Sequence, residues 1–360
     1  MLILVTASPF VNLKLGRYGA NERTVVERIQ ALRASGDDVT LLASERGDSD
    51  PTAFIKMKSL AKKLPNSRMD KVAWVLSPTA YSQLLLYSTV KLNQRWDVVI
   101  NDGMPLDPLT SFLVASKLGL DRTINVLHGG LPLDSPWIRG SGPFVRRPIY
   151  GCQNLNLFSD MRRMGFRVVY FPTGVFFPPV ESVCVEPDDH LIFVGRIAKH
   201  KAPHLAIRIA KRLDMPLKIV GPIGDREYFE TRIRPQLDSE RTYEGELGRK
   251  ALLELVRTSR ALVFTSQNNE SQGLVLLEAL SYGVPIIATP PLRHSGLYDI
   301  LIEGENGIII QPDSTFSRTV DDLFSINRRQ IREAASARWD WHEVVRNYYR
   351  PAFEWITGDC

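Results

Sequence analysis

Short apolar runs, each followed by a turn and a helix, constrain the fold of this chain most strongly. The clearest case passes from a strand pattern at Ala261–Thr265 to a helix pattern at Leu274–Tyr282, which Gly283 and Pro285 end. Four similar apolar runs occur earlier, at Leu2–Thr6, Val39–Ala43, Val98–Ile100 and Ile124–Leu127. Continuous apolar strands are typical of a parallel sheet covered on both faces by helices. The sequence therefore predicts an α/β fold.

The chain is long enough for more than one hydrophobic core. At 360 residues it can form two domains. Proline and acidic residues interrupt both periodicities between Phe171 and Asp189, so the domains are predicted at 1–178 and 179–338. An aromatic helix is expected over 339–360, with its rings in a core. Ligands of open parallel sheets bind beyond the carboxyl ends of the strands, which favours a cleft between the domains.

Two carboxylates flank a glycine where the clearest strand gives way to its helix. Glu270 and Glu278 stand on either side of Gly273, which is placed at a helix N-terminus that favours a phosphate group. If fully helical, the eight positions between the glutamates would span about 12 Å. That exceeds the roughly 5 to 9.5 Å between the two acids of a glycoside hydrolase. The pair is better suited to hold two ends of an extended ligand, such as a nucleotide sugar.

A second strand, turn and helix lies upstream in the same half of the chain. The strand pattern His190–Val194 is followed by Gly195, Arg196 and Lys201. An arginine offers a bidentate fork and a lysine a point charge, and this combination suits a diphosphate. Two basic residues in a loop are often only a solvated surface, but their pairing with the later glycine turn and glutamates favours a ligand site.

These motifs resemble the retaining glycosyltransferases of family 4, which have the GT-B fold. The resemblance rests on the order and spacing of Gly195-Arg196 and Lys201, the strand at 259–266, the Glu270 and Glu278 pair, and the segments 283–288, 304–308 and 340–349. It covers nearly the whole C-terminal half, and the N-terminal half more loosely. It implies two Rossmann-like domains facing each other across a cleft, an acceptor-binding domain followed by a donor-binding domain. It also implies a C-terminal helix that crosses back to the first domain.

The resemblance further implies a metal-independent transfer of a sugar from a UDP-, GDP- or ADP-linked donor to a hydroxyl group. The acceptor would be a glycan, a lipid-linked molecule or a small molecule. The implied site residues are Gly195, Arg196 and Lys201 at the diphosphate, Glu278 at the ribose, Glu270 at the sugar, backbone N–H groups near Gly273 and Leu274, and His128 facing the transferred sugar. Of these, the catalytic residues would be Arg196, Lys201, His128 and Glu270.

Three features depart from the pattern or fall short of a motif. Ala202 stands where the family usually has glycine, and Ser271-Gln272 stands where it commonly has Gly-Phe. Gly19 belongs to a glycine-bearing loop, before a helix expected from about Asn21, that could approach a phosphate or the donor sugar. A plain surface turn explains that loop equally well, and without a three-glycine fingerprint a nicotinamide enzyme is disfavoured.

The positive charge is concentrated in the first half of the chain. Residues 1–180 carry 22 Lys and Arg against 14 Asp and Glu, whereas residues 181–360 carry 23 against 26. The stretch 56–71 contributes lysines, with apolar residues at helical spacing between Met57 and Leu64. Such a helix could touch an anionic membrane, although packing on its own sheet is the simpler explanation. No nucleic-acid motif accompanies the charge.

The cysteines and the chain start bear on the compartment. Cys152, Cys184 and Cys360 are too few and too scattered for a disulfide framework or a zinc site, which favours a reducing cytoplasm. No basic leader and no run of about 20 apolar residues is present. A cytoplasmic protein, peripheral at the inner membrane face at most, is expected. Two further functions stay open: a sugar-nucleotide epimerase or phosphorylase on the same frame, and a non-catalytic nucleotide- or glycan-binding protein.

Overall fold

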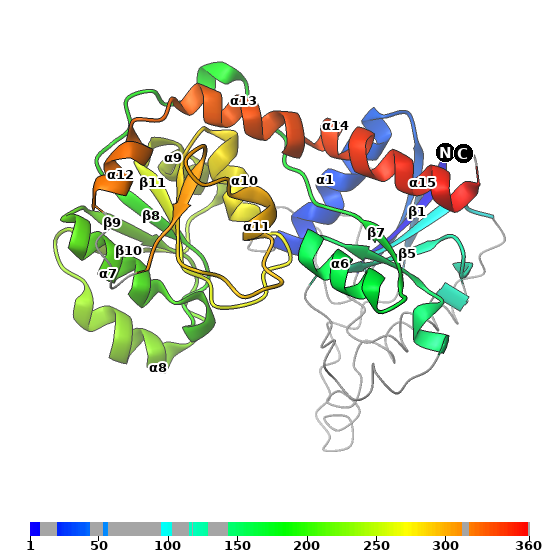
Figure 1. Ribbon diagram of the computed structural model, residues 1–360, viewed down its shortest axis with the longest axis horizontal. Coiled ribbons are helices and arrows are strands. Elements are labelled where there is room, and N and C mark those ends of the chain that lie inside the picture. The colour runs from blue at the N-terminus through cyan, green and yellow to red at the C-terminus, as the bar shows by residue number, and fades with distance from the viewer. Residues whose placement is uncertain are drawn as a thin grey trace. The chain divides into compact units, whose positions relative to one another are not determined.

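The computed structural model describes residues 1–7, 20–43, 53–56, 95–102, 115–116, 118–128, 143–311 and 317–358 (Figure 1). The chain forms two compact units. The first contains Met1–Gly174 together with Trp341–Cys360, and the second contains Val175–Asp340. The divisions thus fall after residues 174 and 340, where the sequence placed them after 178 and 338.

A seven-stranded parallel sheet forms the centre of the first unit. Its strand order is β3-β2-β1-β4-β5-β6-β7. The strands are β1 (Leu2–Ala7), β2 (Asp38–Ala43), β3 (Ala53–Lys56), β4 (Val98–Asp102), β5 (Thr123–Leu127), β6 (Ile149–Cys152) and β7 (Arg167–Tyr170). The helices used below are α1 (Ala20–Ala34), α6 (Leu155–Arg163), α14 (Trp341–Val344) and α15 (Arg350–Thr357). The four apolar runs that predicted strands all lie in this sheet.

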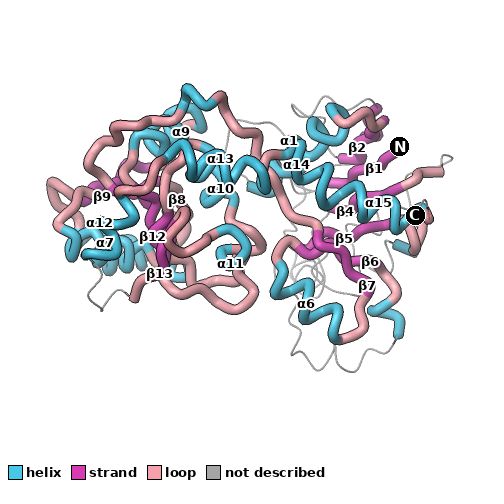
Figure 2. The backbone as a smooth tube through the Cα atoms, turned by 45° about the horizontal axis from the view of Figure 1, so that its top comes forward, coloured by secondary structure: helices cyan, strands magenta, loops and turns pink. Residues whose placement is uncertain are grey.

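The second unit has a six-stranded parallel sheet in the order β10-β9-β8-β11-β12-β13. The strands, magenta in Figure 2, are β8 (Leu191–Val194), β9 (Leu217–Val220), β10 (Arg241–Gly245), β11 (Ala261–Phe264), β12 (Ile286–Ala288) and β13 (Gly307–Ile309). Its helices are α7 (Pro203–Leu213), α8 (Arg226–Tyr228), α9 (Arg249–Thr258), α10 (Leu274–Ser281), α11 (Leu297–Ile300), α12 (Ser317–Phe324) and α13 (Arg328–Trp339). Numbered within the unit, the order 3-2-1-4-5-6 is that of the Rossmann fold. The α/β prediction is confirmed.

Apolar strand residues account for these sheets. Leu191 and Ile219, on neighbouring strands, have no exposed surface, and helix α7 covers them with Ile207 and Ala210. Burial of side chains of this size contributes roughly 1.5 to 3 kcal/mol each, as an upper estimate. Because both faces of a parallel sheet are covered, the strands need no polar alternation.

The C-terminal aromatic segment is divided between the units. Trp339 ends α13 in the second unit, whereas Trp341 and Tyr349 are buried in the first. The Tyr349 ring stacks on Phe171, with centroids 3.8 Å apart and planes 7° from parallel. The expected helix is present from Trp341 to Thr357, where α14, a π-helical turn and α15 follow one another without a break, and only Trp339 falls outside it, at the end of α13. Trp355 is 49% exposed and does not join the core.

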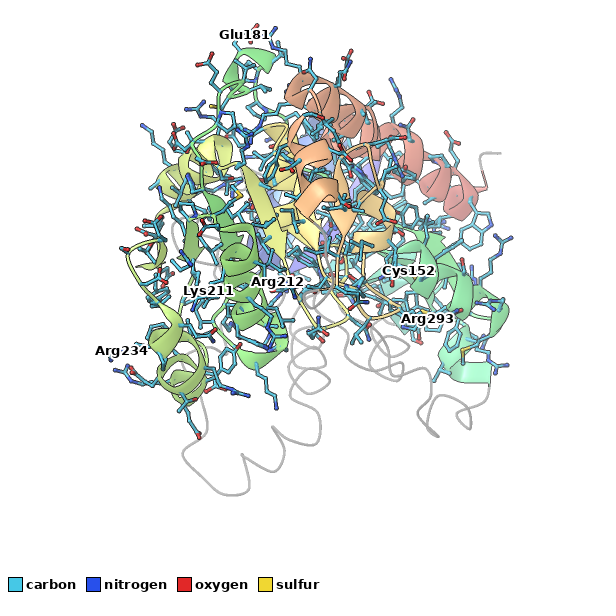
Figure 3. The ribbon with its side chains drawn as sticks, turned by 60° about the vertical axis from the view of Figure 1, so that its left-hand side comes forward. Cys152, Glu181, Lys211, Arg212, Arg234 and Arg293 are labelled. Atoms are coloured by element: carbon cyan, nitrogen blue, oxygen red, sulfur yellow. The ribbon has the colours of Figure 1, made fainter. Side chains whose placement is uncertain are left out.

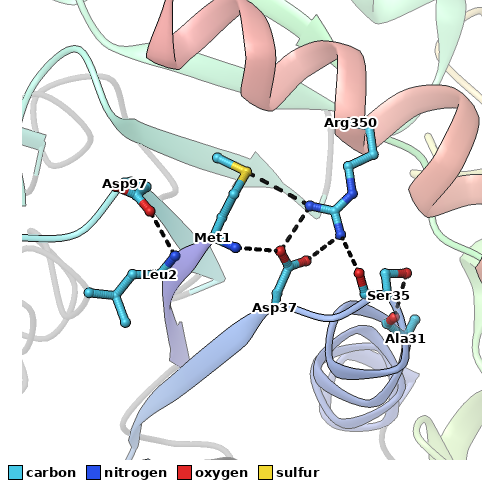
Figure 4. Close-up of polar contacts among 7 residues, drawn as sticks. All are labelled: Met1, Leu2, Ala31, Ser35, Asp37, Asp97 and Arg350. Atoms are coloured by element: carbon cyan, nitrogen blue, oxygen red, sulfur yellow. Dashed lines mark hydrogen bonds and ion pairs between the residues drawn. The ribbon is translucent and has the colours of Figure 1, made fainter. Parts of the chain in front are cut away.

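An ionic contact also attaches the C-terminal segment to the first unit (Figure 4). Arg350 of α15 donates two hydrogen bonds to the Asp37 carboxylate, at 2.9 and 2.7 Å, and one to the backbone oxygen of Ser35 at 3.1 Å. The amino group of Met1 lies 3.1 Å from the same carboxylate. Only 2% of the Asp37 side chain is exposed, so this bidentate pair replaces the water that the carboxylate loses on burial.

Candidate functional site

The candidate site lies at the point in the second sheet where the strand order reverses. Strands β8 and β11 are parallel neighbours, and the chain leaves them toward β9 on one side and β12 on the other. Ligands of open α/β sheets bind beyond the carboxyl ends of the strands at such a switch point. The loops that follow β8 and β11 carry Arg196, Lys201 and Glu270. The topology therefore brings the two predicted motifs to one place.

A left-handed residue shapes the loop after β8. Residues Lys199–Lys201 form a single 3-10 turn, and Ala202 then adopts φ 51° and ψ 47° immediately before α7 begins at Pro203. This region of the backbone map favours glycine, since a Cβ costs roughly 1 to 2 kcal/mol there. The departure from the usual glycine thus falls at a position where glycine has a physical advantage.

Hydrogen bonds connect this loop to the loop after β11. The Thr265 hydroxyl lies 2.9 Å from the backbone oxygen of Lys201 and 3.0 Å from that of Ala202. The backbone N–H of Gln267 donates to the His200 oxygen at 2.7 Å. Thr265 is fully buried, so these bonds also satisfy its hydroxyl. The two loops consequently hold each other in place.

The charged ends of the two motifs meet directly. The Lys201 ammonium and the Glu270 carboxylate form an ion pair, and the Ser266 hydroxyl donates to the same Glu270 oxygen at 2.7 Å. The side chains of Lys201 and Glu270 keep 26% and 17% of their surface exposed. Both groups are therefore fixed in position but still open to a ligand.

Arg196 lies against a glycine from a third loop. A Cβ on Gly224 would stand 2.4 Å from the Arg196 Cδ and 2.5 Å from its Cγ, so only glycine leaves room for this side chain. The backbone oxygen of Ile197 accepts hydrogen bonds from the N–H groups of Gly224, at 3.1 Å, and Asp225, at 3.0 Å. Gly195 and Arg196 thus lie beside the loop after β9. The sequence analysis missed Gly224, for which its only signal was a glycine shortly after a strand.

Gly273 has the backbone conformation that the turn before α10 requires. It is the N-cap residue, with φ 79°, and Leu274 is the first helical residue. Gly296 supports this turn from the loop after β12, where its N–H donates to the backbone oxygen of Glu270 at 2.8 Å. A Cβ on Gly296 would stand 2.4 Å from the Gln272 Cα, so the two backbones meet too closely for any other residue. The sequence analysis did not single out Gly296.

Glu278 has a cationic partner that the sequence analysis also missed. It is 6% exposed on α10, and the Arg249 side chain of α9 donates to its Oε1 at 2.5 Å. Arg249 itself is 43% exposed. The carboxylate proposed for the ribose is therefore paired with a cation at one oxygen. Nothing in the local sequence around Glu278 indicates this pairing, because the two residues belong to different helices.

The remaining predicted residues belong to the first unit or lie outside the described ranges. His128 follows β5 in the first unit, where its Nε2 lies 2.8 Å from Asp102 Oδ1 and its side chain is 4% exposed. Gly19 and the lysine-rich stretch from residue 57 to 71 lie outside the described residues.

Residues 181–338 match the family described as Glycosyl transferases group 1. This match covers nearly the whole second unit, including Arg196, Lys201, Glu270 and Glu278. This segment of the chain belongs to the family. Its resemblance to the family 4 glycosyltransferases is thereby confirmed.

Proteins named as glycosyltransferases occur among the similar curated proteins. A D-inositol 3-phosphate glycosyltransferase of Corynebacterium urealyticum is 29% identical over 174 residues, which are 43% of this chain and 40% of that protein. The sulfoquinovosyl transferase SQD2 of Arabidopsis thaliana is 27% identical over 185 residues, which cover 48% of this chain and 35% of that protein. The chain thus matches less than half the length of these curated relatives.

Solved structures match the fold over the full chain. Sucrose-phosphate synthase of Thermosynechococcus elongatus has a TM-score of 0.72 at 15% identity and covers 100% of both chains. The Anabaena protein HepE in complex with UDP-glucose has a TM-score of 0.65 at 13% identity, with 98% of this chain and 99% of that chain covered. At these identities the likeness shows the fold alone, which is the predicted GT-B fold.

Metal ligands, membrane spans and cysteines can be judged within the described ranges only. There, no group of three or more His, Cys, Asp or Glu side chains is placed to hold a metal ion. The same residues contain no helix long and apolar enough to cross a membrane. Cys152, labelled in Figure 3, is a free thiol buried on β6, and burial raises its pKa. Cys184 is also free.

Proposed function

We propose that this protein is a retaining glycosyltransferase that moves a sugar from a nucleotide-diphosphate donor to a hydroxyl group. The observation that carries the proposal is the cluster at the switch point of the second sheet. Arg196, Lys201, Glu270 and the Gly273 turn come from separate motifs, and they meet where a Rossmann sheet binds its ligand. The family match of the same residues supports it.

Each group in the cluster has a role that its chemistry allows. The Arg196 guanidinium and the Lys201 ammonium neutralise the diphosphate, whose charge grows as the bond to the sugar breaks. Glu270 accepts hydrogen bonds from hydroxyls of the donor sugar. N–H groups at the start of α10, near Gly273 and Leu274, face a phosphate with the favourable end of the helix dipole. Loss of one preorganised cation is expected to raise the barrier by roughly 3 kcal/mol.

The ribose and the acceptor are proposed to bind elsewhere on the same frame. Glu278 accepts hydrogen bonds from the ribose hydroxyls, beside Arg249. The first unit takes the acceptor, a glycan, a lipid-linked molecule or a small molecule, and His128 faces the transferred sugar. Protein cations handle the diphosphate in this scheme, so no metal ion enters the proposal. Cytoplasmic location and contact of the lysine-rich stretch with an anionic membrane also belong to it.

A binding experiment tests the donor site first. The melting temperature is measured with UDP, GDP, ADP, UDP-glucose, GDP-mannose and ADP-glucose for the wild type, Lys201→Ala and Lys211→Ala. Lys211, labelled in Figure 3, lies in the last turn of α7, whereas Lys201 precedes the first turn, and it serves as the charge-matched control. A rise with one nucleotide that survives in the control but is lost in Lys201→Ala supports the proposal. A rise that survives in Lys201→Ala contradicts the placement of the site.

Turnover separates the remaining functions. A transferase releases the nucleoside diphosphate from the selected donor, and it does so faster when an acceptor is present. An epimerase converts the donor sugar without release, and a phosphorylase needs free phosphate. Binding with neither release nor conversion, over a panel of glycan and lipid-linked acceptors, would indicate a non-catalytic binding protein. An anomeric configuration unchanged from donor to product, measured by NMR, tests the retaining outcome.

A further inference from the structure

A chain of buried polar contacts leads to His128 within the first unit. Asp102, at the end of β4, is 2% exposed, and Arg28 of α1 has no exposed surface. Arg28 Nη1 donates to Asp102 Oδ2, and the other carboxylate oxygen lies 2.8 Å from His128 Nε2. The carboxylate thus connects a fixed cation to the imidazole. None of these contacts depends on the second unit.

The charge on Asp102 determines which nitrogen of His128 carries hydrogen. Burial disfavours the charged form, but the Arg28 cation and the hydrogen bond with His128 outweigh it and lower the pKa of Asp102. An ionised carboxylate only accepts hydrogen bonds. His128 Nε2 must therefore donate, so a neutral ring has its lone pair on Nδ1. A carboxylate partner commonly fixes the tautomer and orientation of a functional histidine in this way.

Arg28 is itself held by the C-terminal segment. Its Nε donates to the Tyr349 hydroxyl at 2.9 Å, and that hydroxyl donates to the backbone oxygen of Pro172 at 2.9 Å. The guanidinium carbon lies 5.5 Å from the Phe171 ring centroid, 6.0 Å from that of Trp341 and 5.8 Å from that of Tyr349. Burial raises the pKa of Tyr349 to about 12, so its hydroxyl keeps the proton it donates.

We propose that the C-terminal segment 341–357 positions His128 through Tyr349, Arg28 and Asp102. This inference rests on the proposed function, in which His128 faces the transferred sugar. A buried ion pair is weak evidence for stability, because desolvation offsets much of its attraction. Here the Arg28–Asp102 pair connects Tyr349, near the C-terminus, to the imidazole of His128. Tyr349, Arg28 and Asp102 are positioning residues, since each acts on the reaction through His128.

The first test measures the tautomer of the His128 imidazole directly and needs no ligand. Histidine nitrogens are observed by NMR in the uniformly ¹⁵N-labelled full chain at a pH where the ring is neutral. With six histidines in the sequence, His128→Ala identifies the signals of His128 by their loss. The wild type is expected to show the Nε2–H tautomer. Asp102→Asn offers an amide N–H as well as an oxygen, so the Nδ1–H tautomer should become populated. An unchanged tautomer in Asp102→Asn overturns the proposal.

The second test asks whether Tyr349 acts through His128. Tyr349→Phe removes one hydroxyl and keeps the stacked ring, so it is less disruptive than removal of the buried Arg28. Tyr150→Phe is the matched control, since Tyr150 is also buried in the first unit and its hydroxyl donates to the Val145 oxygen at 2.8 Å. Turnover is measured with whichever of UDP-glucose, GDP-mannose and ADP-glucose the wild type uses.

The expected result is a loss that depends on His128. Tyr349→Phe should lower kcat roughly tenfold, which corresponds to about 1.4 kcal/mol of barrier, with little change in donor KM. The control should keep the wild-type kcat. In a His128→Ala background, Tyr349→Phe should cause no further loss. Independent, multiplicative losses overturn the proposal. If the wild type turns over no donor, the proposed function fails, while the NMR measurement still decides this inference.

Discussion

Gly224→Ala should displace the Arg196 side chain and leave the stability of the fold nearly unchanged. The added Cβ would stand 2.4 and 2.5 Å from two methylene carbons of Arg196, well inside van der Waals contact. Arg196 is exposed, so its side chain can escape to another rotamer at a cost of roughly 0.5 to 1.5 kcal/mol. The φ of Gly224 is not positive, and alanine therefore fits its backbone. We expect a small loss of stability and a larger loss of function.

The functional loss follows from the hydrogen bonds of a charged group. Hydrogen bonds to a charged partner contribute about 1.5 to 3 kcal/mol, so displacement of the guanidinium should weaken diphosphate binding roughly 10- to 100-fold. Isothermal titration calorimetry with the nucleoside diphosphate of the donor measures this change. Gly248→Ala is the control, because a Cβ there would meet nothing within 4 Å. Thermal unfolding of both variants reports their stability.

A double variant isolates the cause of the loss. Arg196→Ala already lacks the displaced group, so adding Gly224→Ala to it should not weaken binding further. Wild-type affinity in Gly224→Ala would refute the role of Arg196 at the diphosphate. A further loss in the double variant would show that the alanine acts on the loop itself and not through Arg196.

Three other substitutions test separate parts of the structure. Arg350→Ala should cost about 3 kcal/mol in the urea unfolding of the first unit, because it leaves the buried Asp37 carboxylate undercompensated. Arg346→Ala, in an exposed pair, should cost less than about 1 kcal/mol, and equal losses would contradict this account. His190→Leu should reduce the drop in melting temperature between pH 7 and pH 5. Burial lowers the pKa of His190, so below about pH 6.5 the unfolded chain binds a proton that the folded chain does not. An unchanged drop in melting temperature in His190→Leu would contradict this role of His190. Gly296→Ala should cost about 1 to 3 kcal/mol and weaken diphosphate binding, since its Cβ would meet the backbone of the loop after β11; wild-type affinity would contradict this.

The sequence indicated those features of the fold that depend on local pattern. Apolar runs such as Val98–Ile100 gave strands because a parallel strand is buried on both faces. Gly273 marked the start of α10 because a positive φ there favours glycine. The C-terminal helix begins at Trp341, two residues later than predicted. The break at Asp340 depends on contacts with Val175 and Phe177, which lie far away in sequence.

The sequence did not reveal the groups that support the predicted site, because these also depend on contacts between residues far apart in sequence. Arg249 and Gly224 act through side-chain contacts between separate loops and helices, and neither residue belongs to a periodic pattern. The pairing of Lys201 with Glu270 joins two motifs that the sequence had interpreted as binding different parts of a ligand. Sheet order alone brings them together, and the sequence analysis did not predict the order of β8 and β11.

The pairing of both motif carboxylates with cations bears on how an anionic donor can bind. A diphosphate that approaches an unpaired carboxylate meets a repulsion of about 4 kcal/mol for two unit charges 4 Å apart near a protein surface. Lys201 neutralises Glu270, and Arg249 neutralises Glu278. Each cation is exposed enough to turn toward a phosphate while it still screens its carboxylate. In the proposed function, the missed Arg249 would thus allow Glu278 to accept ribose hydroxyls without repelling the diphosphate.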